Sequence, residues 1–193
     1  MRNNVPTVLF LPLLKNPEFR SKYINRFCDY ANEIFKLDRI DALIEDYTEN
    51  YLDLLVKGEV RWKGFMFQSE LEAFTNFKTN FEKMFETMRK FLEVRPEYAM
   101  KHMKDYLNIE EDLQEITLST EGKGKGKIKI NSIIPEFKEG KWVGKYFANN
   151  TISVTAIPSE KSEFKGWSGA STSKEKTISL DLVEDTKLTA KFE

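Results

Sequence analysis

The segment Leu13–Phe35 reads LLKNPEFRSKYINRFCDYANEIF and decides how the first half of the chain is interpreted. Asn16 and Pro17 predict a helix start, because Asn caps a first turn well and Pro is favoured at the first helical position. The apolar residues that follow recur every three or four positions, which is typical of a helix with one apolar face. They are Phe19, Tyr23, Ile24, Phe27, Ala31, Ile34 and Phe35. This face and the preceding patch Leu9–Leu14 need a covering surface, and we expect part of it to lie outside this chain.

Further helices are predicted up to residue 107. The second starts at Asp38, stops near Gly58 and buries one stripe, formed by Ile40, Leu43, Ile44, Tyr47, Tyr51, Leu54 and Leu55. The third starts near Ser69, since Ser69 and Glu72 have the spacing of a capping box, and runs to Val94. Its apolar residues are Phe74, Phe77, Phe81, Phe85, Met88, Phe91 and Leu92. Pro96 is expected to break it and to begin a fourth helix, which ends at Asn108.

After the acidic residues 110–112 the apolar period changes from about 3.6 to 2, which indicates strands. Strands are expected at residues 116–118, 127–133, 151–157, 177–182 and 187–192, and Phe164–Gly169 alternates like a strand that ends in a turn. We predict a small antiparallel β module with one face of each strand packed inward. Its core is expected to contain Trp142, Phe147, Phe164, Trp167 and Phe192.

The composition supports a boundary between these halves. The net charge is only −1, so no nucleic acid or acidic membrane is indicated as a partner. All arginines and methionines lie before residue 104, whereas the chain from Gln114 on has 13 lysines, no arginine and 11 acidic residues. We therefore predict a segregated α+β protein, with a helical bundle of about four helices in residues 1–112 and an antiparallel all-β module in residues 113–193. No apolar run is long enough for a membrane span.

Two residues could form a nucleophile pair, namely the single cysteine, Cys28, and the single histidine, His102. Nothing around them has the sequence of a nucleophile turn or an oxyanion loop, and a free cysteine on an apolar helix is usually part of a core. One His and one Cys without HExxH or CxxC spacing predict no metal site. We therefore assign no catalytic, metal-binding or cofactor-binding residue.

The run Gly122–Lys127 alternates Gly and Lys, which invites comparison with a phosphate-binding loop. Its spacing fits neither GxxxxGK nor GxGxxG, and it precedes a strand instead of a helix. A flexible, solvated lead-in to the next strand is the favoured interpretation, and weak polyanion binding is the alternative.

Two arginine pairs stand out in the helical half, Arg61-Trp62 and Arg95-Pro96. The structural interpretation places Trp62 in a gap between helices, with both arginines bonded to carbonyls at helix ends. The functional alternative is a basic rim on a cleft that other residues complete.

Trp142 and Trp167 are the candidate ligand-binding residues of the β module, because aromatic rings on strands can stack on sugars. Packing in the core is the favoured interpretation, since Phe164–Gly169 alternates as an inward-facing aromatic strand would.

The helical half resembles the later part of the CotH (spore-coat protein H) kinase family, over roughly residues 8–109. The resemblance rests on spaced motifs, which are Leu13-Leu14-x-Asn16-Pro17-x-Phe19-Arg20, Tyr23, Arg26-Phe27-x-Asp29, Asn32, Phe35, Arg61-Trp62, Met88-x-x-Phe91, Arg95-Pro96-x-Tyr98, His102 and Tyr106-Leu107. It implies relation to atypical protein kinases that use ATP and a divalent metal to phosphorylate Ser in coat or surface proteins.

The β half is similar to the small β-repeat modules of secreted bacterial surface proteins, including those of internalin B-repeat type. The matching residues are Thr151-x-x-Val154-Thr155-Ala156-x-Pro158, Phe164-x-Gly166-Trp167 and Leu188-Thr189-Ala190-x-Phe192.

This chain departs from the family's pattern in one respect. In the family the nucleotide-contacting lysine and the acidic metal ligands precede the Asn-Pro-x-Phe-Arg helix, so no residue here inherits a catalytic role. We expect a non-catalytic C-terminal portion, whose partners are the N-terminal catalytic half and, further, coat or cell-surface proteins. The expected location is extracellular, on a cell surface or in a spore coat. A homodimer through exposed apolar helix surface and an adhesion or carbohydrate-binding role are the other expectations.

Overall fold

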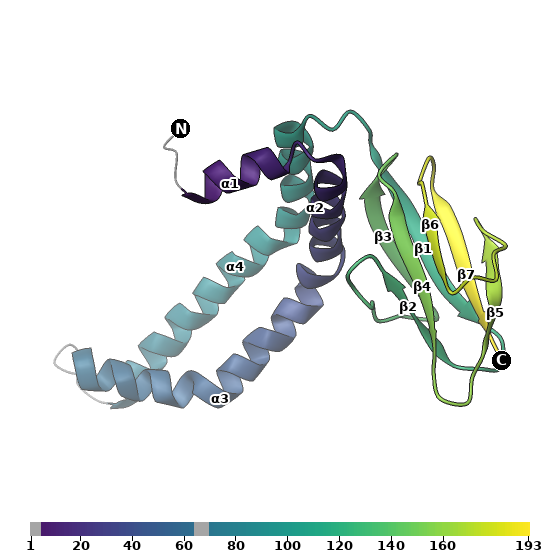
Figure 1. Ribbon diagram of the computed structural model, residues 1–193. Helices are drawn as coiled ribbons and strands as arrows, with labels where there is room; N and C mark the ends of the chain where they lie inside the picture. Colours follow the sequence, from purple (N-terminus) through teal and green to yellow (C-terminus); the bar gives the residue numbers. More distant parts are fainter. Residues whose placement is uncertain (1–4, 64–69) are drawn as a thin grey trace. The chain divides into compact units, whose positions relative to one another are not determined.

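In the computed structural model, residues 5–63 and 70–193 are described. The helical elements are α1 (Val5–Leu13), α2 (Pro17–Asp29), the π-helical turn η1 (Tyr30–Ile34), α3 (Leu37–Lys63) and α4 (Glu70–Leu107) (Figure 1). The predicted start of α2 is confirmed, since the Asn16 side chain accepts a hydrogen bond from the Phe19 N–H at 3.1 Å. The predicted stop at Asn108 is also confirmed, with φ at +48° just after Leu107. All described helices end by Leu107 and all described strands begin at or after Leu113, so the predicted segregated α+β arrangement is correct.

Seven strands form the second half, in two sheets. They are β1 (Leu113–Glu121), β2 (Gly126–Ile130), β3 (Lys141–Phe147), β4 (Ile152–Pro158), β5 (Phe164–Gly169), β6 (Thr177–Leu180) and β7 (Thr186–Phe192). The strand order is β3-β1-β7-β5 in one sheet and β2-β4-β6 in the other. All pairings are antiparallel except β1 with β7, which is parallel, so the expectation of a purely antiparallel module was too simple.

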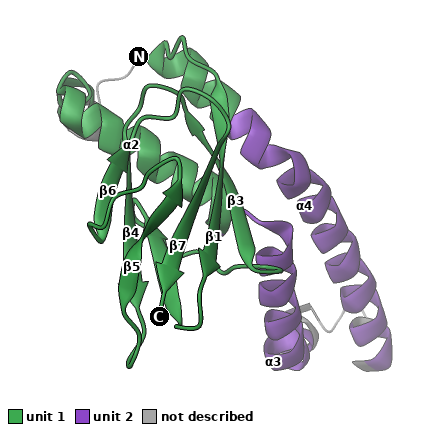
Figure 2. Cartoon of the chain, turned by 90° about the vertical axis from the view of Figure 1, so that its right-hand side faces the viewer, with its two compact units in different colours: residues 1–33, 100–193 green, residues 34–99 purple. Residues whose placement is uncertain are grey.

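The chain divides into two compact units, residues 1–33 with 100–193 and residues 34–99 (Figure 2). The first unit combines α1, α2 and the end of α4 with the β module. The compact units therefore have other boundaries than the two domains predicted from composition. The domain boundary at 112/113 stays a prediction.

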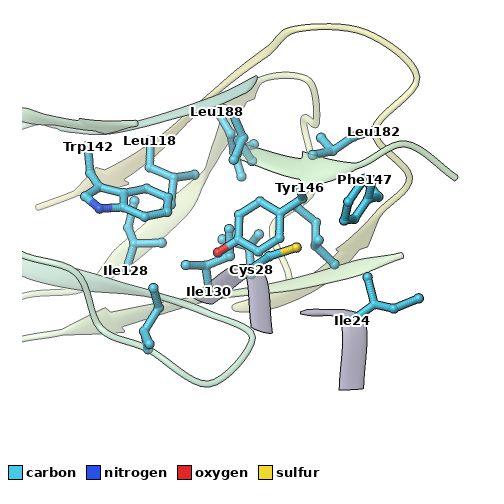
Figure 3. Packing of buried hydrophobic residues seen from close by; sticks show 14 of the residues in the cluster. Ile24, Cys28, Leu118, Ile128, Ile130, Trp142, Tyr146, Phe147, Leu182 and Leu188 are labelled. Atoms are coloured by element: carbon cyan, nitrogen blue, oxygen red, sulfur yellow. The ribbon is translucent and has the colours of Figure 1, made fainter. Parts of the chain in front are cut away.

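The main core lies in the first unit, around the β module. The predicted aromatic residues Trp142, Phe147, Trp167 and Phe192 are all buried, and Phe164 packs against them half-buried. Ile24 and Cys28 reach this core from α2, where the Cys28 side chain lies beside the Tyr146 ring (Figure 3). Tyr23, Phe27 and Ala31 pack against the same cluster. Much of the apolar face predicted for this helix is thus covered by the β module.

Three helix boundaries differ from the prediction. α1 was expected only as an apolar patch, α3 runs past Gly58, and α4 continues through Pro96. Pro96 removes one helical hydrogen bond, which costs about 3 kcal/mol in a helix interior. The residues that follow it, Met100 and Met103, are buried in the core, and their burial offsets that cost. Ser69, the predicted cap of the third helix, lies outside the described residues.

The second unit is a pair of helical segments with little core of its own. A bidentate ion pair joins them, with Arg89 Nε 2.7 Å from one oxygen of Asp41 and its Nη2 2.8 Å from the other. Phe77, Phe81 and Phe85 of α4 are half-buried and contact one another, with ring centroids 5.7 Å apart for Phe77–Phe81 and 4.3 Å for Phe81–Phe85. Phe91 of the same helix is exposed. Within the described part of residues 34–99 only Val56 and Ala99 are buried apolar residues.

The predicted buried stripe of α3 is wrong. Five of its seven residues are exposed, namely Leu43, Tyr47, Tyr51, Leu54 and Leu55. The periodicity correctly gave the face of the helix, but it could not show that no described element of this unit packs there.

Candidate functional site

The clearest constellation of polar side chains is the face that α2 and η1 turn toward the β module. Asn25, Asp29, Asn32 and Glu33 recur at helical spacing, and Asn25 and Asp29 are the buried polar residues of the described chain. Each of the four bonds to a residue at least 100 positions further along the chain. The face therefore fixes α2 on the β module through polar contacts.

Asp29 is the centre of this junction. It is fully buried, and one carboxyl oxygen accepts hydrogen bonds from the Tyr146 hydroxyl at 2.8 Å and from Asn131 Nδ2 at 3.4 Å. The other oxygen accepts from the Ser132 N–H at 3.0 Å and from the Ser132 hydroxyl. Burial, followed by the charge of Asp29, raises the pKa of Tyr146 well above its usual value, so its hydroxyl remains the donor.

Two asparagines extend the junction along the helix. Asn25 donates to the Thr151 carbonyl at 2.7 Å and accepts from Asn150 Nδ2 at 2.6 Å. Asn32 donates to the Lys145 carbonyl at 2.8 Å and accepts from the Lys145 N–H at 2.9 Å. The Asn32 amide thus pairs with β3, an outer strand of its sheet, much as a neighbouring strand would.

The sequence reasoning missed this junction as a site. Asp29 and Asn32 entered only as motif positions of the resemblance, and Ser132 and Tyr146 were not noted at all. The available signal was the recurrence of Asn25, Asp29 and Asn32 on a helix whose other spaced residues are apolar. Polar side chains on such a face usually have buried partners.

Cys28 and His102 offer no nucleophile in this structure. Cys28 is fully buried, and burial raises the pKa of its thiol to about 12. His102 is exposed on α4. The thiol is therefore neutral at physiological pH and is shielded by the core.

Trp142 and Trp167 are 3% and 5% exposed. The indole N–H of Trp142 donates to Glu33 Oε2 at 3.0 Å, and that of Trp167 to the Glu175 carbonyl at 2.9 Å. Stacking on a sugar needs an open ring face, which this structure encloses for both residues. Ligand binding by the two tryptophans stays a prediction.

The Gly–Lys run is packed, contrary to the flexible lead-in that the sequence suggested. A Cβ on Gly122 would lie 2.0 Å from the Phe192 carbonyl oxygen, and one on Gly126 would lie 2.4 Å from the Phe192 ring. The Gly124 N–H donates to the Phe192 carbonyl at 3.0 Å. The glycines therefore let this segment approach the end of β7, while Lys123, Lys125 and Lys127 are exposed.

The arginine pairs also differ from their structural interpretation. Trp62 is 76% exposed and fills no gap between helices, and the Arg61 guanidinium lies over its ring at 5.5 Å. Arg95 lies inside α4, not at a helix end, and its guanidinium is 5.6 Å from the Phe91 ring. The arginine that does bond to a helix end is Arg20, which donates to the Leu107 carbonyl.

A groove of about 880 Å³ runs beside the junction, between α2 and the β2-β4-β6 sheet. Lys22 and Arg26 line it from the helix, and the hydroxyl side chains Ser132, Thr151, Ser153 and Ser179 line it from the β module. Three of these groups already have partners, since Lys22 is paired with Glu18 and the hydroxyls of Ser132 and Thr151 donate to Asp29 and Asp181. The lining residues include no activated nucleophile.

Metal ligands are one requirement of a nucleotide–magnesium site. Residues 5–63 and 70–193 contain no group of three or more His, Cys, Asp or Glu side chains that could hold a metal ion. Asp29, the buried carboxyl group of the groove, already accepts from Tyr146, Asn131 and Ser132, which leaves its oxygens fully engaged. No step of phosphoryl transfer is assigned to these residues.

Comparison with known proteins identifies the class. A family model described as CotH kinase protein matches residues 1–99, and one described as divergent InlB B-repeat domain matches residues 116–193. The chain therefore belongs to the CotH kinase protein family and carries a β-repeat module of the InlB B-repeat kind, as both resemblances predicted. No curated protein and no solved structure matches it significantly.

A helix that crosses a lipid bilayer needs about 20 consecutive, mostly apolar residues. None of the helices in residues 5–63 and 70–193 combines the length and the apolar character that a crossing requires.

Proposed function

We propose that this chain serves as a supporting, non-catalytic C-terminal portion of a CotH-type atypical protein kinase. The helical part stabilises the lobe beside the phosphoryl-transfer site, and the β-repeat module is an accessory domain. The ATP, the divalent metal and the residues that bind them belong to the catalytic half of the same protein. Ser side chains of spore-coat or surface proteins are its substrates.

The observation that carries this proposal is that polar residues of the family motif form hydrogen bonds within this chain. Arg20, Asp29 and Asn32 belong to the family motif, and all three bond to other parts of this chain. Side chains engaged in this way position helices rather than reacting groups. Phosphoryl transfer needs metal ligands, a phosphate cradle and a base held together. The motif helix α2 fixes the position of neighbouring elements and contributes none of these three parts.

The β-repeat match supports an extracellular role for the whole protein, on a cell surface or in a spore coat. In that setting the module holds the enzyme near its substrates. Attachment through the module leaves the helical part free to pack against the catalytic half.

Turnover by the isolated chain is the test. The chain is incubated with labelled ATP, Mg²⁺ or Mn²⁺ and a Ser-rich acceptor, and we expect no transfer above background. Transfer that survives repurification and is lost in a groove variant such as Arg26→Ala would overturn the proposal. A reading frame that continues upstream of the Met1 codon into a secretion signal and an acidic cluster would support it independently.

A second candidate function is adhesion or carbohydrate binding by the β module, and the InlB B-repeat match favours it. A glycan array and a pull-down on cell walls test this alternative. The variants Trp142→Ala and Trp167→Ala need circular-dichroism controls, because both rings are buried. Binding that is retained by Arg26→Ala and lost in a folded tryptophan variant would assign the ligand to the indoles.

A further inference from the structure

One helix carries an exposed apolar stripe that no described residue of its unit covers. On α3, six large residues at helical spacing are between 42% and 76% exposed, and they are Leu43, Tyr47, Tyr51, Leu54, Leu55 and Trp62. They fall within about a third of the helix circumference at 100° per residue. Single exposed apolar residues are ordinary, but a continuous stripe of this length marks an interaction surface.

Gly58 lies within this stripe, between Leu55 and Trp62. Glycine weakens a helix interior relative to alanine, so it needs a reason. A Cβ built on Gly58 meets no other atom within 4 Å, so packing among the described residues gives none. Glycine on an exposed helix face leaves a notch that a side chain from another molecule can enter.

The charges along α3 identify the occupant. On one edge of the stripe the exposed Asp46 precedes the exposed Lys57 and Arg61, while Arg39 lies nearer the start of the helix. Two such helices repel when they are parallel and in register. Side by side in opposite directions, the basic end of each helix comes near Asp46 of the other.

We propose that α3 pairs antiparallel with α3 of a second copy of this chain. The two-fold axis passes between Leu54 and Leu55. In this register Gly58 receives the partner's Tyr51, Trp62 packs on the partner's Tyr47, and Arg61 lies near the partner's Asp46. The contact is isologous and therefore closes as a dimer.

The stripe is large enough for such a contact. In this register Leu43 lies opposite a position beyond the end of the partner's α3, so the contact is made by the other five residues of the stripe. At roughly 100 Å² each, they offer on the order of 500 Å² per copy. Two copies together bury about 1,000 Å², which is the size of a weak or transient protein–protein interface. We therefore expect a dimer that dissociates on dilution. This inference does not depend on the proposed kinase role.

Sedimentation equilibrium of the full chain over about a hundredfold range of concentration tests the pairing. We expect a monomer–dimer equilibrium that Gly58→Leu weakens at least tenfold, because the new side chain fills the notch. The same substitution raises helix propensity, so circular dichroism should show unchanged or increased helix content. The matched control is Ala42→Leu, on the exposed side of α3 outside the stripe, which should leave dimerisation unchanged.

Charge reversal gives a second test that does not depend on the notch. Asp46→Lys and Arg61→Glu should each weaken their own homodimer, since each places like charges together twice. Mixed in equal amounts, the two variants should form a heterodimer, because both of its charge pairs are opposite. A wild-type chain that stays monomeric throughout the range, or a mixture with no more dimer than either variant alone, overturns the proposal and assigns the stripe to a different protein.

Discussion

The hydroxyl of Tyr146 donates a hydrogen bond of 2.8 Å to the carboxyl group of Asp29, and both side chains are fully buried. This contact joins α2, which carries the motif of the CotH family, to β3 of the β-repeat module. In residues 5–63 and 70–193 no buried side-chain nitrogen or oxygen is left without a partner. The junction between the family helix and its module is thus as fully bonded as the interior of a single domain.

Replacement of Asp29 tests the strength of this junction. Asp29→Ala leaves the Tyr146 hydroxyl and the Ser132 donors without their acceptor, so we expect the free energy of unfolding to fall by about 3 kcal/mol. Urea denaturation followed by near-ultraviolet circular dichroism measures the change. The exposed carboxylate Asp46 is the control, and its replacement by Ala should change stability by less than about 0.5 kcal/mol. Equal effects of the two substitutions would contradict a structural role for Asp29.

Alkaline pH should weaken the same junction. Burial raises the pKa of Tyr146 well above 10.0, so the folded chain holds this proton more tightly than the unfolded chain. The resulting stability is complete below about pH 10 and is lost as the pH rises further. Urea denaturation from about pH 8 to about pH 11 should therefore show a steeper decline for the native sequence than for Tyr146→Phe. Because Cys28 has a shift of the same sign, both proteins are compared in a Cys28→Ala background. Parallel curves would rule out a contribution from Tyr146.

The thiol of Cys28 should be inert in the folded protein. Its pKa of about 12 and its complete burial leave almost no accessible thiolate at pH 8. We expect a disulfide reagent to label Cys28 at least about a hundredfold faster in guanidinium than in buffer. Thr172→Cys adds an exposed thiol to the same chain and serves as an internal control. Native labelling of both thiols at similar rates would place Cys28 outside the core.

Alanine substitutions at two glycines should distinguish a steric clash from backbone strain as the cause of destabilisation. Gly122 and Gly140 both have positive φ, at +101° and +76°, but only Gly122 lies against another atom. Alanine at Gly140 should cost about 1 kcal/mol from the backbone conformation alone, whereas alanine at Gly122 should cost about 3 kcal/mol or more. Thermal unfolding compares the two variants. Similar melting temperatures would show that the Gly–Lys run does not pack on Phe192.

Local signals predicted the element types well. Asn16-Pro17 marked the start of α2, Asn108 marked the end of α4, and alternation found most of the strands. β3 was missed because Gly144 interrupts its pattern, although that glycine makes room for the Trp142 ring, which a Cβ there would meet at 2.2 Å.

Tertiary contacts decided what the sequence could not show. Helical continuation through Pro96 depends on burial of the residues after it, which local rules do not include. The α3 stripe was assigned to a core because periodicity shows which residues share a face, not what covers them. The Asp29 junction joins residues more than 100 positions apart, so no short segment contains it.

Calorimetric titration of the chain with ATP and Mg²⁺ tests the central claim most directly. A supporting portion whose motif residues bond internally should give no saturable heat at micromolar nucleotide, while circular dichroism shows the chain folded. Saturable micromolar binding by the folded chain, abolished by a substitution in its own groove, would contradict the supporting role.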